Sequence, residues 1–306
     1  FPTVAFPNPE ESGALDLANS MAERLGADVV IANDPDADRL GITLPTQDGW
    51  ENLTGNQIGQ LMADYVLASY VPTRDGDPAT PIVINSIVSS PMLEFIAEEY
   101  GARFETTLTG FKWIANAAMD LEAAGRGTFV FGYEEALGYT VGPVVRDKDG
   151  ISAALVFADL VADLKAGGHT VHDQLGVLYR KHGLWISTQK SVVRPGSSGK
   201  AEIAAAMTLL AERQPSELAG IRVSSVTDLR QGALERPRWL PASALVVLEL
   251  DELGRVLVRP SGTEPKLKIY VDAKSTLVGE VADAVDELTA DADKVAEAMA
   301  HFLGFG

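Results

Sequence analysis

The chain contains no cysteine. That absence excludes disulfide bonds, zinc sites built from thiolates and cysteine nucleophiles. Basic residues are also scarce, because 25 Lys and Arg stand against 43 Asp and Glu and give a formal net charge of −18. Nucleic acids and anionic lipids bind through clustered Lys and Arg, so we expect neither nucleic acid nor a membrane as a partner. A phosphorylated ligand would need a local basic pocket or a metal ion.

Long apolar runs are missing too, and no segment approaches the length of a membrane span. Together with the absence of cysteine, this fits a cytoplasmic location. The chain opens with Phe1, Pro2 and Thr3, so we expect it to begin partway through a longer polypeptide. Its 306 residues, 46% of them apolar, allow two or three domains with buried cores.

Hydrophobic periodicity predicts alternating strands and helices in the first part of the chain, which is typical of an α/β domain. Helices are expected at 14–27, 54–69, 91–100, 111–124 and 151–166. Strands are expected at 27–32, 81–85, 103–107 and 128–131, and a polar turn at 73–78.

The later part predicts a different class. A helix at 200–213 precedes short strands at 221–226, 244–249, 256–258 and 267–272, and a last helix covers 276–302. This pattern favours an α+β domain with a small antiparallel sheet. Boundaries near 52 and 186 give three domains, at 1–51, 52–185 and 186–306.

The first loop that could carry chemistry holds Asp34, Asp36, Asp38 and Arg39 after the strand at 27–32. In an extended loop these three carboxylates project to the same side and offer the hard oxygen ligands that suit Mg²⁺. Arg39 could hold a phosphate beside the metal. The alternative is a solvated acidic turn. An EF-hand is excluded, because its sixth and twelfth positions would be Arg39 and Pro45 rather than Gly and Glu.

Two further loops combine charges with glycine. Glu134 and Glu135 directly follow the strand at 128–131, where they could accept hydrogen bonds from sugar hydroxyls; a turn with exposed acids is the alternative. Lys148 lies in the segment 146–150 before a helix. It could bind phosphate in a cleft or assist proton transfer, and the alternative is a type I turn with solvated charges.

The fourth loop, residues 259–266, lies between two short strands and combines Arg259, two hydroxyls, a glycine and Lys266. Such a set suits a phosphate dianion, with a structural hairpin as the alternative. Residues 196–201 look like a phosphate loop but lack its spacing, so we expect a flexible loop that caps the next helix. The four histidines show no metal-ligand spacing.

Taken together and in this order, the four loops resemble the phosphohexomutase superfamily of phosphoglucomutases and phosphomannomutases. The resemblance covers nearly the whole chain. Pro35 stands where many members carry Gly. With the segment 107–113, this variant is similar to the phosphoglucomutase-2 and phosphopentomutase branch.

The resemblance implies a role for each matching residue. Asp34, Asp36 and Asp38 would bind Mg²⁺ together with a phosphoserine oxygen. The candidate catalytic cations are Lys148 and Arg39. The sugar site would comprise Glu134, Glu135, Thr109 and Gly110. The distal phosphate would be bound by Arg259, Ser261, Gly262, Thr263 and Lys266. Ala136 departs from the family pattern, because many members carry Ser there, so the preferred sugar stays open among glucose, mannose and a pentose.

Family members have four domains, and their nucleophile is a phosphorylated serine in a Ser-His-Asn-Pro loop of the first. No Ser-His pair occurs in this chain. The resemblance therefore implies the end of the second domain, the third domain and the fourth. It implies transfer of phosphate between C1 and C6 of a hexose, with Mg²⁺, a hexose 1,6-bisphosphate activator and the missing N-terminal domains as partners. The chain alone would be inactive. Two alternatives stay open: an aspartyl-nucleophile phosphatase that uses Asp34, and a non-catalytic sugar-phosphate-binding protein.

Overall fold

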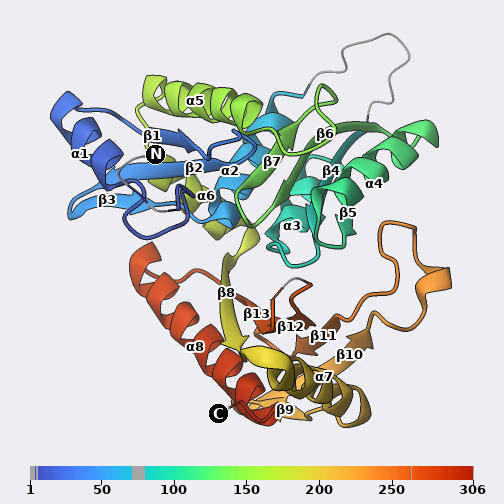
Figure 1. Ribbon diagram of the computed structural model, residues 1–306. Coiled ribbons are helices and arrows are strands. Elements are labelled where there is room, and N and C mark those ends of the chain that lie inside the picture. Colours follow the sequence, from blue (N-terminus) through green and yellow to red (C-terminus); the bar gives the residue numbers. More distant parts are fainter. Residues whose placement is uncertain (1–3, 5, 71–79, 263, 306) are drawn as a thin grey trace. The chain divides into compact units, whose positions relative to one another are not determined.

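The computed structural model describes residues 4, 6–70, 80–262 and 264–305. It divides into two compact units, Phe1–Leu178 and Tyr179–Gly306, and each is described by itself (Figure 1). The predicted polar turn at 73–78 and the predicted phosphate ligand Thr263 lie outside the described residues. Among the helices of the described residues, none has the length and apolar character that crossing a bilayer requires.

The larger sheet of the first unit has four strands in the order β5-β4-β6-β7. Its strands are β4 (Pro81–Ser86), β5 (Arg103–Thr107), β6 (Thr128–Glu134) and β7 (Gly138–Val141). The first three are parallel, and β7 returns antiparallel to β6. The helices beside this sheet are α2 (Gly55–Ala68), α3 (Met92–Glu99) and α4 (Phe111–Ala123). Since β4, β5 and β6 are parallel, their carboxyl ends meet at one edge, where ligands of such sheets bind.

The same unit contains a second, antiparallel sheet in the order β1-β2-β3. It comprises β1 (Val30–Asn33), β2 (Leu40–Thr46) and β3 (Gly49–Asn52), preceded by α1 (Asp16–Leu25). Helix α5 (Gly150–Ala166) contacts β1, β2 and also β7, so it connects the two sheets (Figure 1). Helix α6 (Val171–His182) follows, and its Gln174 amide donates to Asp64 of α2.

Local sequence explains where these helices begin. Thr54 and Gln57 form a capping box at α2, in which each side chain bonds the backbone of the other. Asp149 caps α5 by accepting the N–H groups of Ile151 and Ser152. Asp149 lies within the candidate loop 146–150, and α2 begins against the β6–β7 hairpin, since a Cβ atom at Gly55 would collide with the carbonyl oxygen of Glu135.

The second unit is an antiparallel sheet of six strands in the order β8-β13-β12-β11-β10-β9. Its strands are β8 (Leu184–Val193), β9 (Glu217–Leu218), β10 (Ile221–Asp228), β11 (Val246–Leu250), β12 (Gly254–Pro260) and β13 (Lys266–Ser275). Helix α8 (Val281–Phe302) packs on β8 and β13, and α7 (Gly196–Glu212) packs on β12 and β13. A 3₁₀ turn covers Ala233–Glu235. The predicted fold, α/β followed by α+β with an antiparallel sheet, is confirmed.

Several local predictions were wrong. Residues 196–201 form the first turn of α7 instead of a flexible loop. The strand predicted at 27–32 is β1, which begins at Val30 and is mostly half-buried. Strand β6 continues to Glu134, so the first of the two candidate acids lies at a strand end rather than in a loop. The division into three domains stays a prediction.

Candidate metal and sugar-phosphate site

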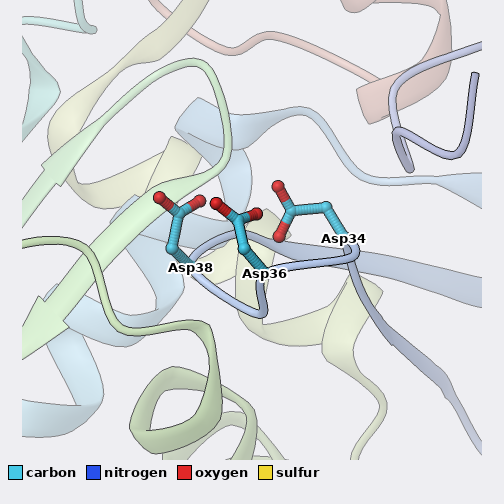
Figure 2. A group of neighbouring side chains, drawn as sticks. All are labelled: Asp34, Asp36 and Asp38. Atoms are coloured by element: carbon cyan, nitrogen blue, oxygen red, sulfur yellow. The ribbon is translucent and has the colours of Figure 1, made fainter.

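The acidic loop between β1 and β2 brings three carboxylates together. One oxygen from each of Asp34, Asp36 and Asp38 lies within 4.8 Å of the other two. Figure 2 shows the three carboxylates pointing to the same side of the loop. The loop is not extended as predicted, because it forms a turn in which Ala37 has a φ of 58°.

Hydrogen bonds fix the backbone of this loop. The N–H of Ala37 donates to the carbonyl of Asp34 at 3.0 Å. The carbonyl of Ala37 accepts the N–H of Gly150 at 3.1 Å, and the carbonyl of Arg39 accepts the side-chain amide of Asn33 at 2.6 Å. A Cβ atom at Gly150 would collide with the carbonyl oxygen of Arg39. Helix α5 therefore begins directly against the acidic loop, and only glycine fits there.

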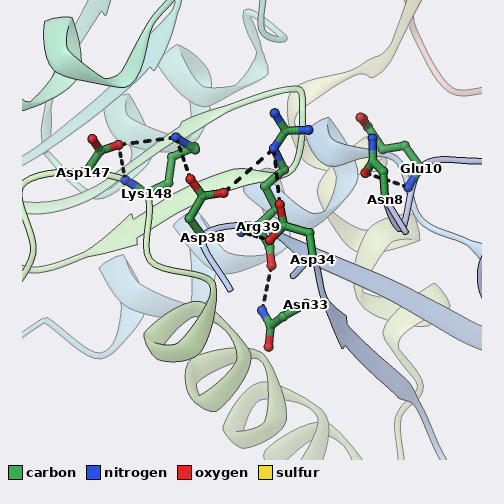
Figure 3. Close-up of polar contacts among 8 residues, drawn as sticks. All are labelled: Asn8, Glu10, Asn33, Asp34, Asp38, Arg39, Asp147 and Lys148. Carbon is green, nitrogen blue, oxygen red and sulfur yellow. Dashed lines mark hydrogen bonds and ion pairs between the residues drawn. The ribbon is translucent and has the colours of Figure 1, made fainter. Parts of the chain in front are cut away.

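Two predicted cations lie at the rim of the cluster (Figure 3). The ammonium nitrogen of Lys148 is 3.0 Å from Asp38 Oδ2 and 3.4 Å from Asp147 Oδ1. Arg39 Nε is 3.9 Å from both Asp34 Oδ2 and Asp38 Oδ1. Partial burial alone lowers the pKa of the Lys148 ammonium group, but the hydrogen bond to Asp38 and the charges of Asp147 and Asp38 outweigh it and raise that pKa. Lys148 is therefore a cation at neutral pH, and in this arrangement it is not a proton acceptor.

The hairpin between β6 and β7 adjoins this cluster. Leu40, after the acidic loop, donates its N–H to the carbonyl of Leu137 at 3.0 Å, and Arg39 pairs with Gly138 in a single β-bridge. The aliphatic part of Lys148 lies against Gly138, where an added Cβ would be 2.7 Å from its Cδ atom. The predicted metal loop, the acid-bearing hairpin and Lys148 thus form one continuous site.

The other predicted sugar ligands lie at the carboxyl ends of the parallel strands. Glu134, at the end of β6, is buried and accepts the N–H of Gly110 at 2.5 Å. Gly110 has a φ of 117° and precedes α4, while Thr109 next to it is half-buried. Glu134, Thr109 and Gly110 are therefore close together, as a single sugar site would require.

Glu135 occupies a different environment. Its Oε2 atom accepts the hydroxyl groups of Ser86 at 3.1 Å and Ser89 at 3.2 Å. Its backbone N–H also donates to the Ser89 hydroxyl at 3.0 Å. Glu135 therefore connects β6 to the loop after β4, whereas Ala136 beside it is exposed.

In the second unit, the predicted phosphate-binding residues lie where β12 ends and β13 begins, with Arg259 inside β12 and Lys266 as the first residue of β13. Ser261 donates its N–H to the carbonyl of Lys266 at 2.7 Å, and Lys266 Nζ is 3.1 Å from Glu264 Oε2. Ser261, Gly262 and Lys266 border a hollow of about 480 Å³ that α7 closes on another side. Strands β12 and β13 thus form a hairpin, and Lys266 of this hairpin borders the hollow. This arrangement is compatible with phosphate binding.

The acidic loop fits Mg²⁺ on its own geometry. Mg²⁺–oxygen bonds of about 2.0–2.1 Å place neighbouring ligand atoms about 2.9 Å apart and opposite ones about 4.1 Å apart. Carboxylate oxygens already within 4.8 Å of one another need only small side-chain movements to reach those spacings. A hollow of about 400 Å³ adjoins Asp34, Asp36 and Asp38, which leaves room for water or phosphate ligands.

Sequence reasoning missed the residues that hold the site together. Asn33, Gly138 and Gly150 act on backbone or aliphatic atoms, so no charge or motif marks them. Phe111 is also part of this environment, because Lys148 Nζ lies 5.9 Å from the centre of its ring. The only signal was the position of the two glycines within otherwise charged or polar loops.

Comparison with known families identifies this arrangement. The model of phosphoglucomutase/phosphomannomutase α/β/α domain II matches residues 1–47, that of domain III matches 54–182, and that of the C-terminal domain matches 212–288. The chain belongs to the phosphohexomutase superfamily. The resemblance found in its four loops is thereby confirmed.

Relatives of this phosphohexomutase chain carry several names. It is 42% identical over 305 residues to a probable phosphomannomutase of Haemophilus influenzae, covering 99% of this chain and 56% of the relative. It is 38% identical to the phosphoribomutase of Saccharomyces cerevisiae, covering 89% of this chain and 48% of the relative. The mouse phosphopentomutase is 34% identical, with 89% and 46% covered. The chain thus spans about half the length of the curated relatives it matches.

Solved structures support the fold of this phosphohexomutase chain. A putative phosphomannomutase from Thermus thermophilus has a TM-score of 0.60 at 22% identity. The match covers 95% of this chain and 51% of the Thermus chain. Parafusin, a phosphoglucomutase from Paramecium, has a TM-score of 0.62 at 20% identity, with 91% and 46% covered. At these identities the likeness concerns the fold alone.

Proposed function

We propose that this chain provides the metal, sugar and distal phosphate sites of a sugar-phosphate mutase. The whole enzyme would move phosphate between C1 and C6 of a hexose through a bisphosphate intermediate, with hexose 1,6-bisphosphate as activator. The observation that supports this proposal most is the cluster of Asp34, Asp36 and Asp38, with two cations at its rim and the β6–β7 hairpin beside it. A region outside this chain would supply the phosphoserine.

Each part of the site would have a separate task. Mg²⁺ at the three aspartates would offset charge on the transferring phosphoryl group. Lys148 and Arg39 would hold phosphate oxygens as permanent cations, in charge-assisted hydrogen bonds. Glu134 would accept sugar hydroxyls, and Arg259 and Lys266 would bind the phosphate that does not react. Positioning of both reacting groups then lowers the barrier.

The alternative of an aspartyl-nucleophile phosphatase is less consistent with the geometry. Oδ1 of Asp34 accepts the backbone N–H of Arg39 at 3.0 Å, and the Asp34 side chain is only 11% exposed. An attacking carboxylate needs an oxygen in line with the phosphorus atom. One oxygen of the Asp34 carboxylate is therefore held by its own loop, an arrangement that suits a metal ligand better than a nucleophile.

The metal site is tested by titrating the chain with Mg²⁺ in a calorimeter. Asp36→Asn removes one charged ligand, so we expect it to weaken binding by about tenfold or more. Asp48→Asn is the matched control, because Asp48 is an exposed aspartate in the turn between β2 and β3 of the same unit. Equal affinities for the wild type and Asp36→Asn would show that the acidic loop is a solvated turn.

A further inference from the structure

The rim of the acidic cluster is occupied by the protein's own cation. Lys148 Nζ lies 3.0 Å from Asp38 Oδ2, which is a hydrogen-bonded ion pair, and the two side chains are 22% and 31% exposed. Figure 3 shows the ammonium group between Asp38 and Asp147. A pair this exposed exchanges partners readily, because its net stabilisation is small.

Acidic groups outnumber basic ones around the acidic loop, so a divalent cation would be attracted to it. Four carboxyl groups, those of Asp34, Asp36, Asp38 and Asp147, lie here beside only two basic groups, those of Arg39 and Lys148. The two cations thus offset only part of the repulsion among the carboxylates. A divalent ion would balance the remainder, and Lys148 would no longer be needed at Asp38.

Displacement of Lys148 would not disturb the fold of the loop. The loop backbone is held by Asn33, which donates to the carbonyl of Arg39, and by Gly150, which donates to the carbonyl of Ala37. Neither bond involves the ammonium group. The Lys148 side chain can therefore leave Asp38 while the acidic loop keeps its shape.

The path of the Lys148 side chain depends on residue 138 being a glycine, which has no Cβ atom. A Cβ atom at Gly138 would lie 2.7 Å from Cδ and 3.1 Å from Cγ of Lys148, and 3.6 Å from Cδ2 of Phe111. Gly138 does not have a positive φ, so alanine is compatible with its backbone. The narrow space between Gly138 and Phe111 directs the ammonium group toward Asp38.

We propose that Lys148 is an internal counter-ion that a divalent cation displaces from Asp38, so that metal binding releases its ammonium group to bind a phosphate ligand. This inference rests on the proposed function, since it presumes that Asp38 is a metal ligand. It adds that the metal ion and the phosphate bind cooperatively. The metal ion takes Asp38 away from Lys148, which frees the ammonium group for phosphate. Phosphate takes Lys148 away from Asp38, which frees the carboxylate for the metal ion. Gly138 acts as a positioning residue for this exchange.

The exchange is tested by calorimetric titration of the chain with Mg²⁺, with and without inorganic phosphate. Without phosphate, Lys148→Met removes the competitor, so we expect Mg²⁺ to bind about three- to fivefold tighter than to the wild type. Gly138→Ala keeps the charge but displaces the lysine, so it should change the affinity in the same direction. Lys165→Met, which breaks a pair of 2.7 Å with Asp28, is the matched charge control and should leave the affinity unchanged.

With phosphate, the wild type should bind Mg²⁺ more tightly than without it, and Lys148→Met should lose most of that gain. Equal or weaker Mg²⁺ binding by Lys148→Met in the absence of phosphate would overturn the exchange, as would full cooperativity in this variant. Asp36→Asn separates this failure from failure of the metal site. If Asp36→Asn weakens binding while Lys148→Met has no effect, only the exchange is wrong, and if neither has an effect, both proposals are wrong.

Discussion

Two carboxylate–cation pairs in this chain have nearly the same length but different surroundings. In the second unit, Arg255 Nε lies 2.8 Å from Asp272 Oδ2, and the Asp272 side chain is 1% exposed. In the first unit, Lys148 Nζ lies 3.0 Å from Asp38 Oδ2, and the Asp38 side chain is 31% exposed. Distance alone does not distinguish them.

Their neighbours explain what each pair can do. Arg255 and Asp272 are directly opposite each other on β12 and β13, and Ser187 on β8 completes the row by donating to Asp272 at 2.6 Å. Removal of one partner would leave a buried charge without compensation. Asp38 instead lies beside open space and two further carboxylates, so another cation can replace Lys148. Burial therefore separates a structural pair from an exchangeable one.

The largest expected effect is on the buried pair. Arg255→Met should lower the free energy of unfolding by about 3–5 kcal/mol, because the buried carboxyl group of Asp272 loses its cationic partner and keeps only the Ser187 hydroxyl. Arg222→Met is the control, since its pair with Asp251 spans 3.7 Å and its side chain is 77% exposed. Urea unfolding at about pH 7 measures both. If Arg255→Met and Arg222→Met lowered the free energy of unfolding equally, burial would not distinguish the two ion pairs.

The loss in Arg255→Met should also depend on pH. Burial raises the pKa of Asp272, and Arg255 and the Ser187 hydroxyl offset part of that rise. Without Arg255 the pKa rises further, so the folded variant binds a proton more readily than its unfolded chain does. The contribution of Asp272 to the stability of the variant is therefore greatest at low pH, and it is lost as the pH rises through the pKa of Asp272 in the folded state. Urea unfolding at about pH 4.5 should therefore show a smaller difference from wild type than at about pH 7, and an equal or larger difference would argue against a charged Asp272.

The smallest effect is expected at the exchangeable pair. Lys148→Met should change the free energy of unfolding by less than about 1 kcal/mol, because the pair is partly solvated and the loop backbone is held by Asn33 and Gly150. Urea unfolding in the absence of Mg²⁺ is the measurement. A loss as large as that of Arg255→Met would mean that Lys148 is part of the scaffold.

The sequence predicted the fold class and the loops because both depend on local patterns. Residues 81–84 are apolar and buried in β4, and the carboxylates of Asp34, Asp36 and Asp38 gather as their spacing suggested. Strands β2, β3, β7, β8 and β9 and helix α6 were not predicted. Strand β7 has only four residues, and β8 carries alternating polar residues along the edge of its sheet. Such segments depend on tertiary pairing for their structure.

The packing of the site could not be read from the sequence for a related reason. The contacts of Gly138 and Gly150 involve residues brought together only by the fold, and the partners of Glu135 lie 46 and 49 positions earlier in the chain. A motif identifies the groups that carry charge. It does not identify the uncharged positions that determine where those groups point.

Mutase turnover of the purified chain tests the central claim most directly. The claim is that these 306 residues hold the metal and sugar-phosphate sites but not the phosphate donor. A coupled dehydrogenase assay with glucose 1-phosphate and glucose 1,6-bisphosphate, and a parallel assay with ribose 1-phosphate, should show no turnover by the chain alone. A longer polypeptide that also carries a phosphoserine domain should be active, and should lose activity when its donor serine becomes alanine. Robust turnover by the 306-residue chain, with its mass confirmed, would contradict the account, because the nucleophile would then lie within it.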